Sequence, residues 1–506
     1  MGEARTLMVQ GTASSVGKSI LVAALCRIFR NEGLRVTPFK AQNMALNSSV
    51  TPDGLEIGRA QAVQAAAAGI EPSVEMNPIL LKPEHGMRSQ VVVMGKPLGT
   101  MPWAEYSAMR PRFTAIVAEC LAKLRRSYDL VLIEGAGNPA EINLKSNDIV
   151  NMHVARLADA PVLMVGDIDR GGVFAQLVGT MELLAHDERS RVAGFLINKF
   201  RGNADLLRPG TDFLESRFGI PVLGVIPFIE RLRVADEDSV ALDERPAQSA
   251  GARAPVRIAV VRVPHISNFD DFLALEHEAG VELVFVERPD ALSTADLAII
   301  PGSKVTVSDL AWMRAQGFAD AFMARARAGG PILGICGGCQ MLGERIEDPL
   351  GVESGAAETK ALGLLPLVAR FERDKVTTRV RATANTISFL TDNRRLDDEI
   401  SGYEIHMGRT ALTRAGRSAF RIIARNGASC DVADGAVGGD GTVVGTMLHG
   451  IFDNAHLRRA MLARLGGSRW VDASDGSEGH EPEYERLSAI VRENLDFESL
   501  RRIARL

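Results

Sequence analysis

Short apolar runs alternate with longer amphipathic stretches along most of the chain, and this alternation predicts its secondary structure. In the first half, runs rich in β-branched residues and leucine occupy residues 6–11, 34–39, 130–135, 161–169, 192–199 and 221–227. Each run has the length of a buried strand, and most of the intervening stretches are long enough for a crossover helix. We therefore expect an α/β domain with a doubly wound, mostly parallel sheet.

The same alternation returns in the second half after an interruption. Residues 235–255 are rich in charge, alanine and proline and carry no apolar periodicity, which is typical of a linker. Strand-like runs then resume at residues 256–263, 281–287, 296–303 and 331–336. The pattern predicts a domain over 1–234, a linker over 235–255 and a second doubly wound α/β domain over 256–506.

Composition and charge narrow the classes of function. The chain has 506 residues, of which 46% are hydrophobic and 24% charged, with a formal net charge of −5. There is no basic excess for a nucleic-acid partner. No apolar run approaches the roughly 18 residues of a membrane span, and no charged-then-apolar leader is visible, so we expect a cytoplasmic protein. Five scattered cysteines are not a secreted disulfide framework, so reduced thiols are expected.

A glycine-rich loop, "VQGTASSVGKS" at 9–19, follows the first predicted strand and runs into a predicted helix. Such a loop points backbone N–H groups at a phosphate, adds the positive end of a helix and supplies a lysine. Five residues rather than the usual four separate its outer glycines, and a turn that merely needs glycine is the alternative. The order of strand, loop, Lys-Ser and helix favours ATP binding by Gly11, Thr12, Gly17, Lys18 and Ser19.

A second strand ends in an acid beside this loop. In "VLIEGAGNPAEINL" at 131–144, Glu134 stands at the carboxyl end of a strand, where a Mg²⁺ ligand would meet the phosphates together with the Ser19 hydroxyl. The alternative is an acid in a solvated loop. The stretch "NKFRG" at 198–202 also follows a strand and could face a base or ribose, which is a weak signal alone.

A cysteine at the apex of a glycine-rich turn is the strongest candidate nucleophile. In "ILGICGGCQMLG" at 332–343, a strand, a sharp turn and a helix would expose Cys336 and aim neighbouring N–H groups at an oxyanion. Cys339 completes a C-x-x-C, so a redox pair, half of a zinc site and a plain buried cysteine stay open. His449, after the apolar strand of "GTVVGTMLHGIF", is the candidate base, although a lone histidine there is often only structural.

These motifs resemble known families. "GICGGCQMLG", "IIPGSK" and "MLHG" resemble the class I glutamine amidotransferase domain. The first half, with "GTASSVGKS", "FKAQNMALNS", "EIGRAQ", "EGAGNPAEINL", "DIDRGGVFA" and "NKFRG", is similar to the dethiobiotin-synthetase-like P-loop domain of the cobyric acid synthase family. "SGYEIHMG" at 401–408 is also typical of that family. The resemblance runs in order through both halves.

The resemblance implies an enzyme that uses ATP, Mg²⁺ and L-glutamine to amidate a polycarboxylate corrinoid, adenosylcobyrinic acid a,c-diamide, giving adenosylcobyric acid in cobalamin biosynthesis. It implies Cys336 as thiolate nucleophile and His449 as general base and then acid, with the oxyanion held near Gly302 and Gly337. It also implies Mg²⁺ ligation by Ser19, Glu134 and, more weakly, Glu56. Basic residues that could bind the carboxylates of the acidic corrinoid are Arg59, Lys82, Arg88 and Arg170. For each of them, an ordinary solvated position on the surface is an equal alternative.

One departure and two rival functions accompany this interpretation. Many class I amidotransferases place a glutamate two residues after the histidine, but Ile451 stands there, so a backbone carbonyl or an acid such as Asp453 would have to orient His449. The first rival is the related cobyrinic acid a,c-diamide synthase. The second is a nucleotide-dependent switch or partitioning ATPase with an inactive amidotransferase domain, against which Cys336 and His449 argue. The sequence leaves a homo-oligomer open.

Overall fold

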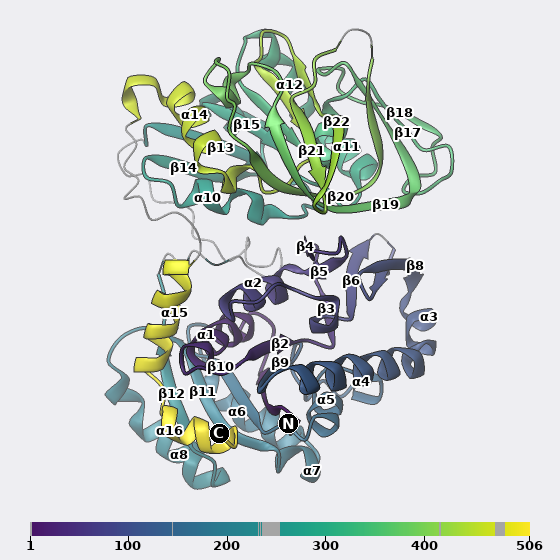
Figure 1. Ribbon diagram of the computed structural model, residues 1–506. Helices are drawn as coiled ribbons and strands as arrows, with labels where there is room; N and C mark the ends of the chain where they lie inside the picture. The colour runs from purple at the N-terminus through teal and green to yellow at the C-terminus, as the bar shows by residue number, and fades with distance from the viewer. Residues whose placement is uncertain are drawn as a thin grey trace. The chain divides into compact units, whose positions relative to one another are not determined.

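The computed structural model describes residues 3–84, 86–143, 145–230, 232, 234, 254–413, 416–470 and 481–506. These residues divide into two compact units, each with its own core (Figure 1). The first unit contains the described residues within 1–45, 57–241 and 480–506, and the second those within 46–56 and 242–479.

The first unit is built on a parallel six-stranded sheet with the order β12-β11-β10-β1-β9-β2. Its strands are β1 (Arg5–Gly11), β2 (Val36–Phe39), β9 (Leu130–Glu134), β10 (Val162–Asp167), β11 (Val192–Phe200) and β12 (Val222–Pro227). The apolar runs predict all six of these strands, and the strand order changes direction beside β1, as a doubly wound topology requires.

Helices cover both faces of this sheet, because successive strand residues point to opposite sides. Leu7 and Val9 of β1 pack with α1 (Lys18–Asn31), while Met8 belongs to the core on the other face. The first face also carries α15 (Glu481–Glu493) and α16 (Phe497–Ile503). The other face carries α4 (Arg110–Ser127), α5 (Met152–Leu157), α6 (Val173–Leu183) and α8 (Arg208–Phe218).

A smaller sheet with the order β3-β6-β7-β8 completes the first unit. It contains β3 (Gln42–Met44), β6 (Ile79–Glu84), β7 (Arg88–Val93) and β8 (Lys96–Pro102), of which the last three are antiparallel neighbours. The remaining described helices of the unit are α2 (Arg59–Ala67), α3 (Trp103–Ala108) and α7 (His186–Arg189). None of the apolar runs that indicate strands in the first half of the sequence corresponds to this second sheet.

The second unit repeats the theme with a six-stranded sheet of order β14-β13-β15-β16-β24-β23. Five strands are parallel, namely β13 (Val256–Val261), β14 (Val281–Val286), β15 (Leu297–Ile300), β16 (Ile332–Ile335) and β24 (Val443–Thr446). The edge strand β23 (Ala436–Gly438) is antiparallel. The helices of this unit are α10 (Leu273–Glu276), α11 (Thr306–Ala315), α12 (Phe318–Arg327), α13 (Gly337–Leu342) and α14 (Ala455–Gly466).

A second, mixed sheet packs on the same core in this unit. It contains β17 (Arg345–Glu347), β18 (Glu358–Lys360), β19 (Leu367–Ala384), β20 (Ile400–Leu412), β21 (Phe420–Arg425) and β22 (Ala428–Asp434). The long strands β19 and β20 pair antiparallel. One continuous apolar cluster joins residues of both sheets, for example Ile335 of β16 and Ala382 of β19.

The predicted fold class, two doubly wound and mostly parallel α/β domains, is confirmed. Two segments depart from a simple consecutive division of the chain. Helices α15 and α16 pack on the core of the first unit, where Leu487 and Leu500 join residues of α1, because their apolar faces need that cover. Conversely, residues 46–56 cluster with the second unit, including β4 (Ser48–Val50). Most of the predicted linker, residues 235–253, lies outside the described residues. The linker therefore stays a prediction.

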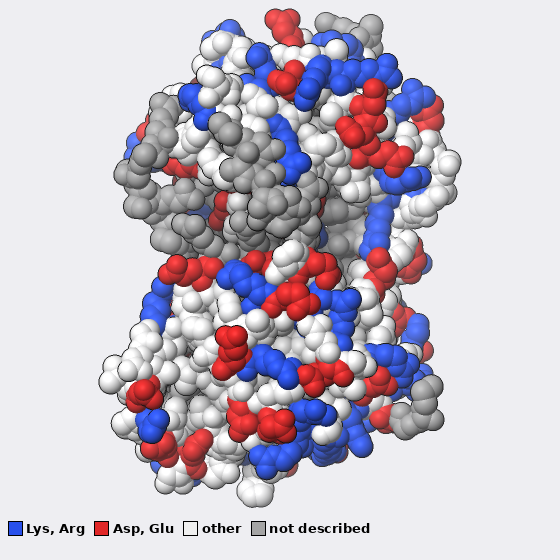
Figure 2. Space-filling view, turned by 60° about the vertical axis from the view of Figure 1, so that its left-hand side comes forward, with Lys and Arg blue, Asp and Glu red and all other residues white. Residues whose placement is uncertain are grey.

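Acidic and basic side chains are interspersed over the face drawn in Figure 2. Within the described ranges, no helix is long and apolar enough to cross a membrane.

Candidate active site

The turn after β16 holds the candidate nucleophile in a backbone conformation that is unusual for its residue type. Cys336 has φ +51° and precedes α13 directly, as a strained strand-to-helix elbow requires. The helix lies so close to β15 that a Cβ atom on Gly338 would stand 2.0 Å from the Ile300 carbonyl oxygen. Glycine is therefore needed at that position for the elbow to pack against the sheet.

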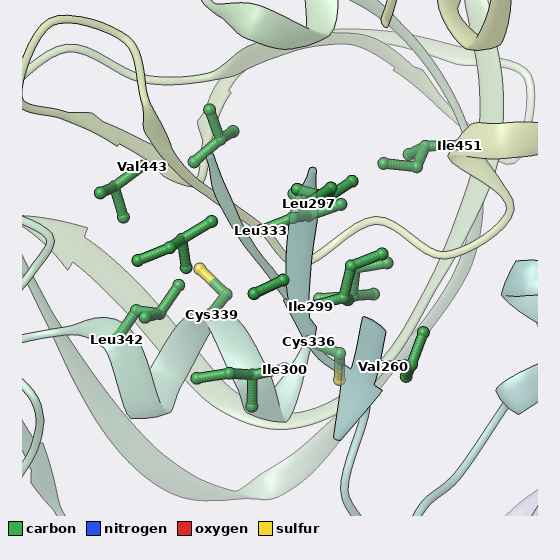
Figure 3. Packing of buried hydrophobic residues seen from close by; sticks show 14 of the residues in the cluster. Val260, Leu297, Ile299, Ile300, Leu333, Cys336, Cys339, Leu342, Val443 and Ile451 are labelled. Carbon is green, nitrogen blue, oxygen red and sulfur yellow. The ribbon is translucent and has the colours of Figure 1, made fainter. Parts of the chain in front are cut away.

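The two cysteines of the C-x-x-C lie in different surroundings, and both are free thiols. The Cys339 side chain packs in the core, 2.8 Å from where a Cβ on Gly445 would lie, and burial raises the pKa of its thiol well above the usual range. Figure 3 shows the Cys336 and Cys339 sulfurs pointing in opposite directions. Cys336 Sγ instead lies 3.7 Å from the Ile405 carbonyl oxygen of β20. The arrangement favours a lone nucleophile at 336 over a redox pair.

His449 follows β24, the neighbour of β16 in the sheet. Because these parallel strands pair from Ile332↔Val443 to Ile335↔Thr446, their carboxyl ends bring Cys336 and His449 to the same edge. The imidazole is stacked on the Tyr403 ring, with centroids 5.2 Å apart and planes at 17°. The two residues also exchange backbone hydrogen bonds of 2.9 and 3.1 Å. The stacking fixes the face of the imidazole ring, and the backbone hydrogen bonds fix the main chain that carries it.

Asp271 orients this histidine, which the sequence analysis did not foresee. His449 Nδ1 donates to Asp271 Oδ2 at 2.6 Å, and the Gly450 N–H donates to Oδ1 at 2.8 Å. Burial alone would lower the pKa of His449, but the charge and hydrogen bond of Asp271, together with the interaction with Cys336, outweigh it and raise this pKa to about 10. Asp271 therefore orients His449, a role for which the sequence suggested Asp453 or a backbone carbonyl.

The bond to Asp271 determines which nitrogen is left for chemistry. Among the described residues, His449 Nε2 makes no hydrogen bond of ordinary geometry. A carboxylate on Nδ1–H makes Nε2 the nitrogen that exchanges a proton with the thiol and the leaving group. The arrangement of Cys336, His449 and Asp271 therefore fits a nucleophile, a base and the acid that orients the base. The catalytic roles of Cys336 and His449 stay a prediction.

The predicted oxyanion residues lie beside this group. A Cβ atom on Gly302, which follows β15, would stand 3.1 Å from His449 Cε1, and one on Gly337 would stand 2.9 Å from the Ser303 N. The loop is anchored by Asp309, whose Oδ2 accepts a 2.6 Å hydrogen bond from Ser303 Oγ. Glycine at both positions leaves room for a substrate carbonyl next to backbone N–H groups. Their role as the oxyanion hole stays a prediction.

The glycine-rich loop of the first unit lies between β1 and α1. Gly17 is its last residue, with φ +95°, and a Cβ there would stand 2.2 Å from Asn198 Nδ2. The Lys18 ammonium donates to the Ala13 carbonyl at 2.8 Å, across the loop, and Thr12 Oγ1 donates to Gln176 at 3.1 Å. The loop is thus closed around its lysine, as a phosphate cradle requires.

Asn198 lies within β11, so the stretch "NKFRG" begins inside the strand and not, as the sequence suggested, after it. Its side-chain Nδ2 donates to the Val16 carbonyl at 2.8 Å and so supports the loop from β11. Lys199 forms an ion pair with Asp167 at 2.8 Å. In this structure the motif stabilises the phosphate loop; its suggested contact with a base or ribose stays a prediction.

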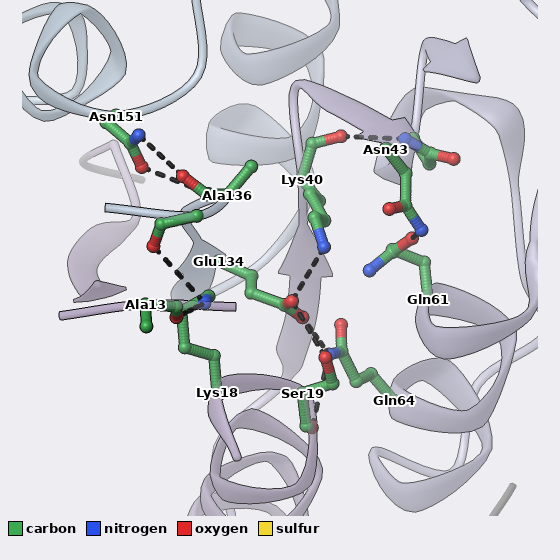
Figure 4. A network of polar contacts seen from close by, with 12 residues as sticks. Ala13, Lys18, Ser19, Lys40, Asn43, Gln61, Gln64, Glu134, Ala136 and Asn151 are labelled. Atoms are coloured by element: carbon green, nitrogen blue, oxygen red, sulfur yellow. Dashed lines mark hydrogen bonds and ion pairs between the residues drawn. The ribbon is translucent and has the colours of Figure 1, made fainter. Parts of the chain in front are cut away.

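Glu134 is the centre of a buried polar network at the carboxyl end of β9 (Figure 4). Its Oε1 accepts from Ser19 Oγ and from the Lys40 ammonium, both at 2.8 Å, and its Oε2 accepts from Gln64 at 2.5 Å. Strands β1, β9 and β2 are neighbours, so their ends deliver the loop, Glu134 and Lys40 together. Sequence reasoning missed Lys40, although it directly follows a predicted strand.

The donor set of this network suits Mg²⁺. A carboxylate and a hydroxyl are hard oxygen ligands, and Mg²⁺ usually takes one or two protein ligands beside phosphate oxygens and water. Within the described ranges, no cluster of three His, Cys, Asp or Glu residues could hold a metal alone. Ser19 and Glu134 would hold the ion, and it would supply charge neutralisation at transferring phosphate oxygens.

The remaining predicted residues are placed as follows. Glu56 clusters with the second unit, where its fully buried carboxylate accepts from Ser48 Oγ at 2.8 Å and pairs with Lys375 at 2.5 Å. Its role as a metal ligand stays a prediction.

The four basic residues predicted to bind the corrinoid lie in the first unit. Lys82 is buried in β6, and Arg59 begins α2. Arg88 donates to the Thr100 carbonyl, and the half-exposed Arg170 lies 3.9 Å from Asp167. Their contacts with substrate also stay predictions.

Comparisons with known proteins agree with the family resemblance of both halves of the chain. Residues 7–241 match the family "CobQ/CobB/MinD/ParA nucleotide binding domain", and residues 257–457 match the "CobB/CobQ-like glutamine amidotransferase domain". Cobyric acid synthase of Sorangium cellulosum is 56% identical over 99% of both chains. That of Syntrophobacter fumaroxidans is 47% identical over 99% of both, and that of Moorella thermoacetica is 51% identical over 98% of this chain and 96% of its own. The chain is thus an amidating enzyme and belongs to the cobyric acid synthase family.

Proposed function

We propose that the enzyme uses ATP, Mg²⁺ and L-glutamine to amidate the b, d, e and g carboxylates of adenosylcobyrinic acid a,c-diamide, giving adenosylcobyric acid. The observation that carries the proposal is the presence, in one chain, of a buried Cys336–His449–Asp271 group and a phosphate loop with Ser19 beside Glu134. The first suits release of ammonia from glutamine. The second suits activation of a carboxylate by ATP.

In the glutaminase half, the Cys336 thiolate attacks the amide carbon of glutamine, and N–H groups near Gly302 and Gly337 hold the oxyanion. The His449 imidazolium gives its proton to the departing nitrogen, so ammonia leaves and a glutamyl thioester forms. Neutral His449 then takes a proton from water, whose oxygen attacks the thioester. The thiolate and imidazolium are restored, and glutamate departs after its new carboxyl group has released the second proton of the water to solvent.

In the synthetase half, a corrinoid carboxylate attacks the γ-phosphorus of ATP, giving an acyl phosphate and ADP. Ammonia then attacks the acyl carbon and phosphate leaves, because a phosphate is a far better leaving group than an oxide ion. Lys18, and Lys40 on the other side of Glu134, bring positive charge to this site. Positioning and charge stabilisation are the main tools for such a transfer.

Mass spectrometry of the corrinoid tests the proposal. The enzyme is incubated with the a,c-diamide, ATP, Mg²⁺ and glutamine carrying ¹⁵N in its side-chain amide. We expect a product with four added amides, each carrying the label. No addition to the diamide, together with amidation of unamidated cobyrinic acid, would identify the enzyme as the related a,c-diamide synthase. Label incorporation without any need for ATP would contradict the acyl phosphate route.

A further inference from the structure

One short segment from the synthetase half of the sequence belongs to the glutaminase unit. Residues 46–56 lie between elements of the first unit along the chain, yet they cluster with the second unit. The segment folds back on itself, since β4 and β5 (Glu56–Gly58) pair and the Thr51 N–H donates to the Leu55 carbonyl at 2.8 Å. It is therefore a small hairpin rather than an open connection.

Buried polar contacts hold this hairpin on the second unit. Glu56 is 0% and Lys375 5% exposed at the side chain, and they form an ion pair of 2.5 Å. Arg379, on the same strand β19, donates from Nε to the Val50 carbonyl at 2.9 Å. A charge pair without access to water keeps its geometry only if both partners stay in place, so the hairpin is firmly seated.

One end of the hairpin supports the residue that orients the catalytic histidine. The Ser48 N–H donates to Asn268 Oδ1 at 3.0 Å, and both residues are buried. Asn268 adopts a left-handed conformation, φ +52°, at the start of the 3₁₀ turn Phe269–Phe272, which carries Asp271. The Asp271 N–H in turn donates to the Asn268 carbonyl at 3.0 Å. Ser48 therefore acts on Asp271 through a single residue.

The other strand end packs behind the histidine and the nucleophile. Among the described residues, Val50, Tyr403 and Ile405 form a small buried apolar cluster of their own. Tyr403 is the ring stacked on His449, and the Ile405 carbonyl is the oxygen 3.7 Å from Cys336 Sγ. A displacement of Val50 would therefore move Tyr403 and Ile405, and through them the positions of His449 and Cys336 would change.

The flanks of the same segment reach the phosphate site. Lys40, six residues before the segment begins, and Gln64, eight residues after it ends, both donate to the Glu134 carboxylate, at 2.8 and 2.5 Å. The segment is therefore tied through the chain, on both sides, to the carboxylate that would meet Mg²⁺ and ATP.

We propose that residues 46–56 are a positioning segment for the glutaminase dyad and couple it to the occupancy of the synthetase site. Binding of ATP and corrinoid around Glu134 shifts Lys40 and Gln64, the hairpin transmits the shift to Tyr403 and Asn268, and the dyad becomes productive only then. This inference rests on the proposed function for the identity of the ligands. Coupling of this kind typically changes affinity or rate by a factor of about 5 to 150.

The test compares Val50→Ala with Val286→Ala, a buried valine of β14 outside the hairpin cluster. Glutaminase activity is measured with and without Mg-ATP and the a,c-diamide, and amidation is measured separately with ammonium salt. In the wild type and Val286→Ala we expect the ligands to raise glutaminase kcat several-fold. In Val50→Ala we expect this stimulation to fall close to one, while ammonia-driven amidation stays within about twofold.

A reciprocal measurement needs no turnover. Cys336 is alkylated with the glutamine analogue 6-diazo-5-oxo-L-norleucine, and ATP affinity is measured by calorimetry before and after. Because coupling of binding is reciprocal, alkylation should change the Kd for ATP in the wild type and leave it unchanged in Val50→Ala.

The outcomes separate this inference from the proposed function. Unchanged stimulation in Val50→Ala, or an equal loss of ammonia-driven amidation, would overturn the role of the hairpin. A wild type that makes no corrinoid amide with ammonia would instead contradict the proposed function, and the ATP calorimetry would still decide whether the hairpin couples the two sites.

Discussion

The two units place their chemistry at the same edge of similar sheets but assemble it in different ways. In the first unit, nine consecutive residues, 11–19, form the phosphate loop, and Glu134 and Lys40 come from the neighbouring strand ends. In the second, Asp271, Gly302, Cys336 and His449 come from four distant segments. A phosphate can be bound by local backbone N–H groups, whereas a buried nucleophile needs several side chains in register.

The largest expected effects come from disabling each unit in turn. Cys336→Ala removes the nucleophile, so glutamine-dependent amidation should fall by at least about 10³-fold, while amidation from ammonium salt should persist. Lys18→Ala removes charge at the transferring phosphoryl group, so neither nitrogen source should support amidation. Rates are measured with both donors at a pH where free NH₃ is present. Full glutamine-dependent synthesis by Cys336→Ala, or wild-type ammonia-dependent synthesis by Lys18→Ala, would contradict the division of labour.

Asp271→Asn should cost less than loss of the nucleophile and should leave the first unit untouched. We expect glutaminase kcat to fall about 10²- to 10⁴-fold, because an amide cannot hold the imidazolium in the same way. Asp271 raises the pKa of His449, so its removal should move the alkaline limb of the kcat/KM profile for glutamine to lower pH. Asp453→Asn is the matched control. A larger loss in the control would restore Asp453 as the orienting acid.

Glu56 distinguishes a metal ligand from a structural carboxylate. As half of a buried ion pair, Glu56→Gln should destabilise the second unit by about 3–5 kcal/mol, as should its partner variant Lys375→Met. Both should lower Tm together and leave the Mg²⁺ concentration for half-maximal ammonia-driven amidation unchanged. A higher Mg²⁺ requirement in Glu56→Gln but not in Lys375→Met would instead support the metal role predicted from sequence.

The smallest effect on catalysis is expected two residues after the histidine. Ile451 is buried in the core of the second unit, so Ile451→Ala should cost about 2–5 kcal/mol of stability through the cavity it leaves. Its glutaminase rate per folded molecule should change far less than that of His449→Ala. The comparison uses kcat below the Tm of both variants. Equal catalytic losses would mean that the dyad has been misplaced.

Sequence alone determined most of the parallel strands and the local motifs. The strands β1, β2, β9, β10, β11 and β12, and the strands β13 to β16, all coincide with predicted apolar runs. A buried parallel strand reads as an uninterrupted apolar segment whatever surrounds it. The loop 11–19 and the elbow at Cys336 were equally visible, because glycine placement and turn geometry are local properties.

Only the tertiary structure decided which distant residues meet at each site and which unit residues 46–56 belong to. Asp271 lies 178 positions from His449 along the chain, and Lys40 lies 94 from Glu134, so only strand order brings these partners together. The transfer of residues 46–56 to the second unit depends on a buried charge pair with Lys375 and on packing against Tyr403. Such contacts depend on burial and geometry that exist only after the sheets have formed. The local sequence of residues 46–56 therefore gives no sign of them.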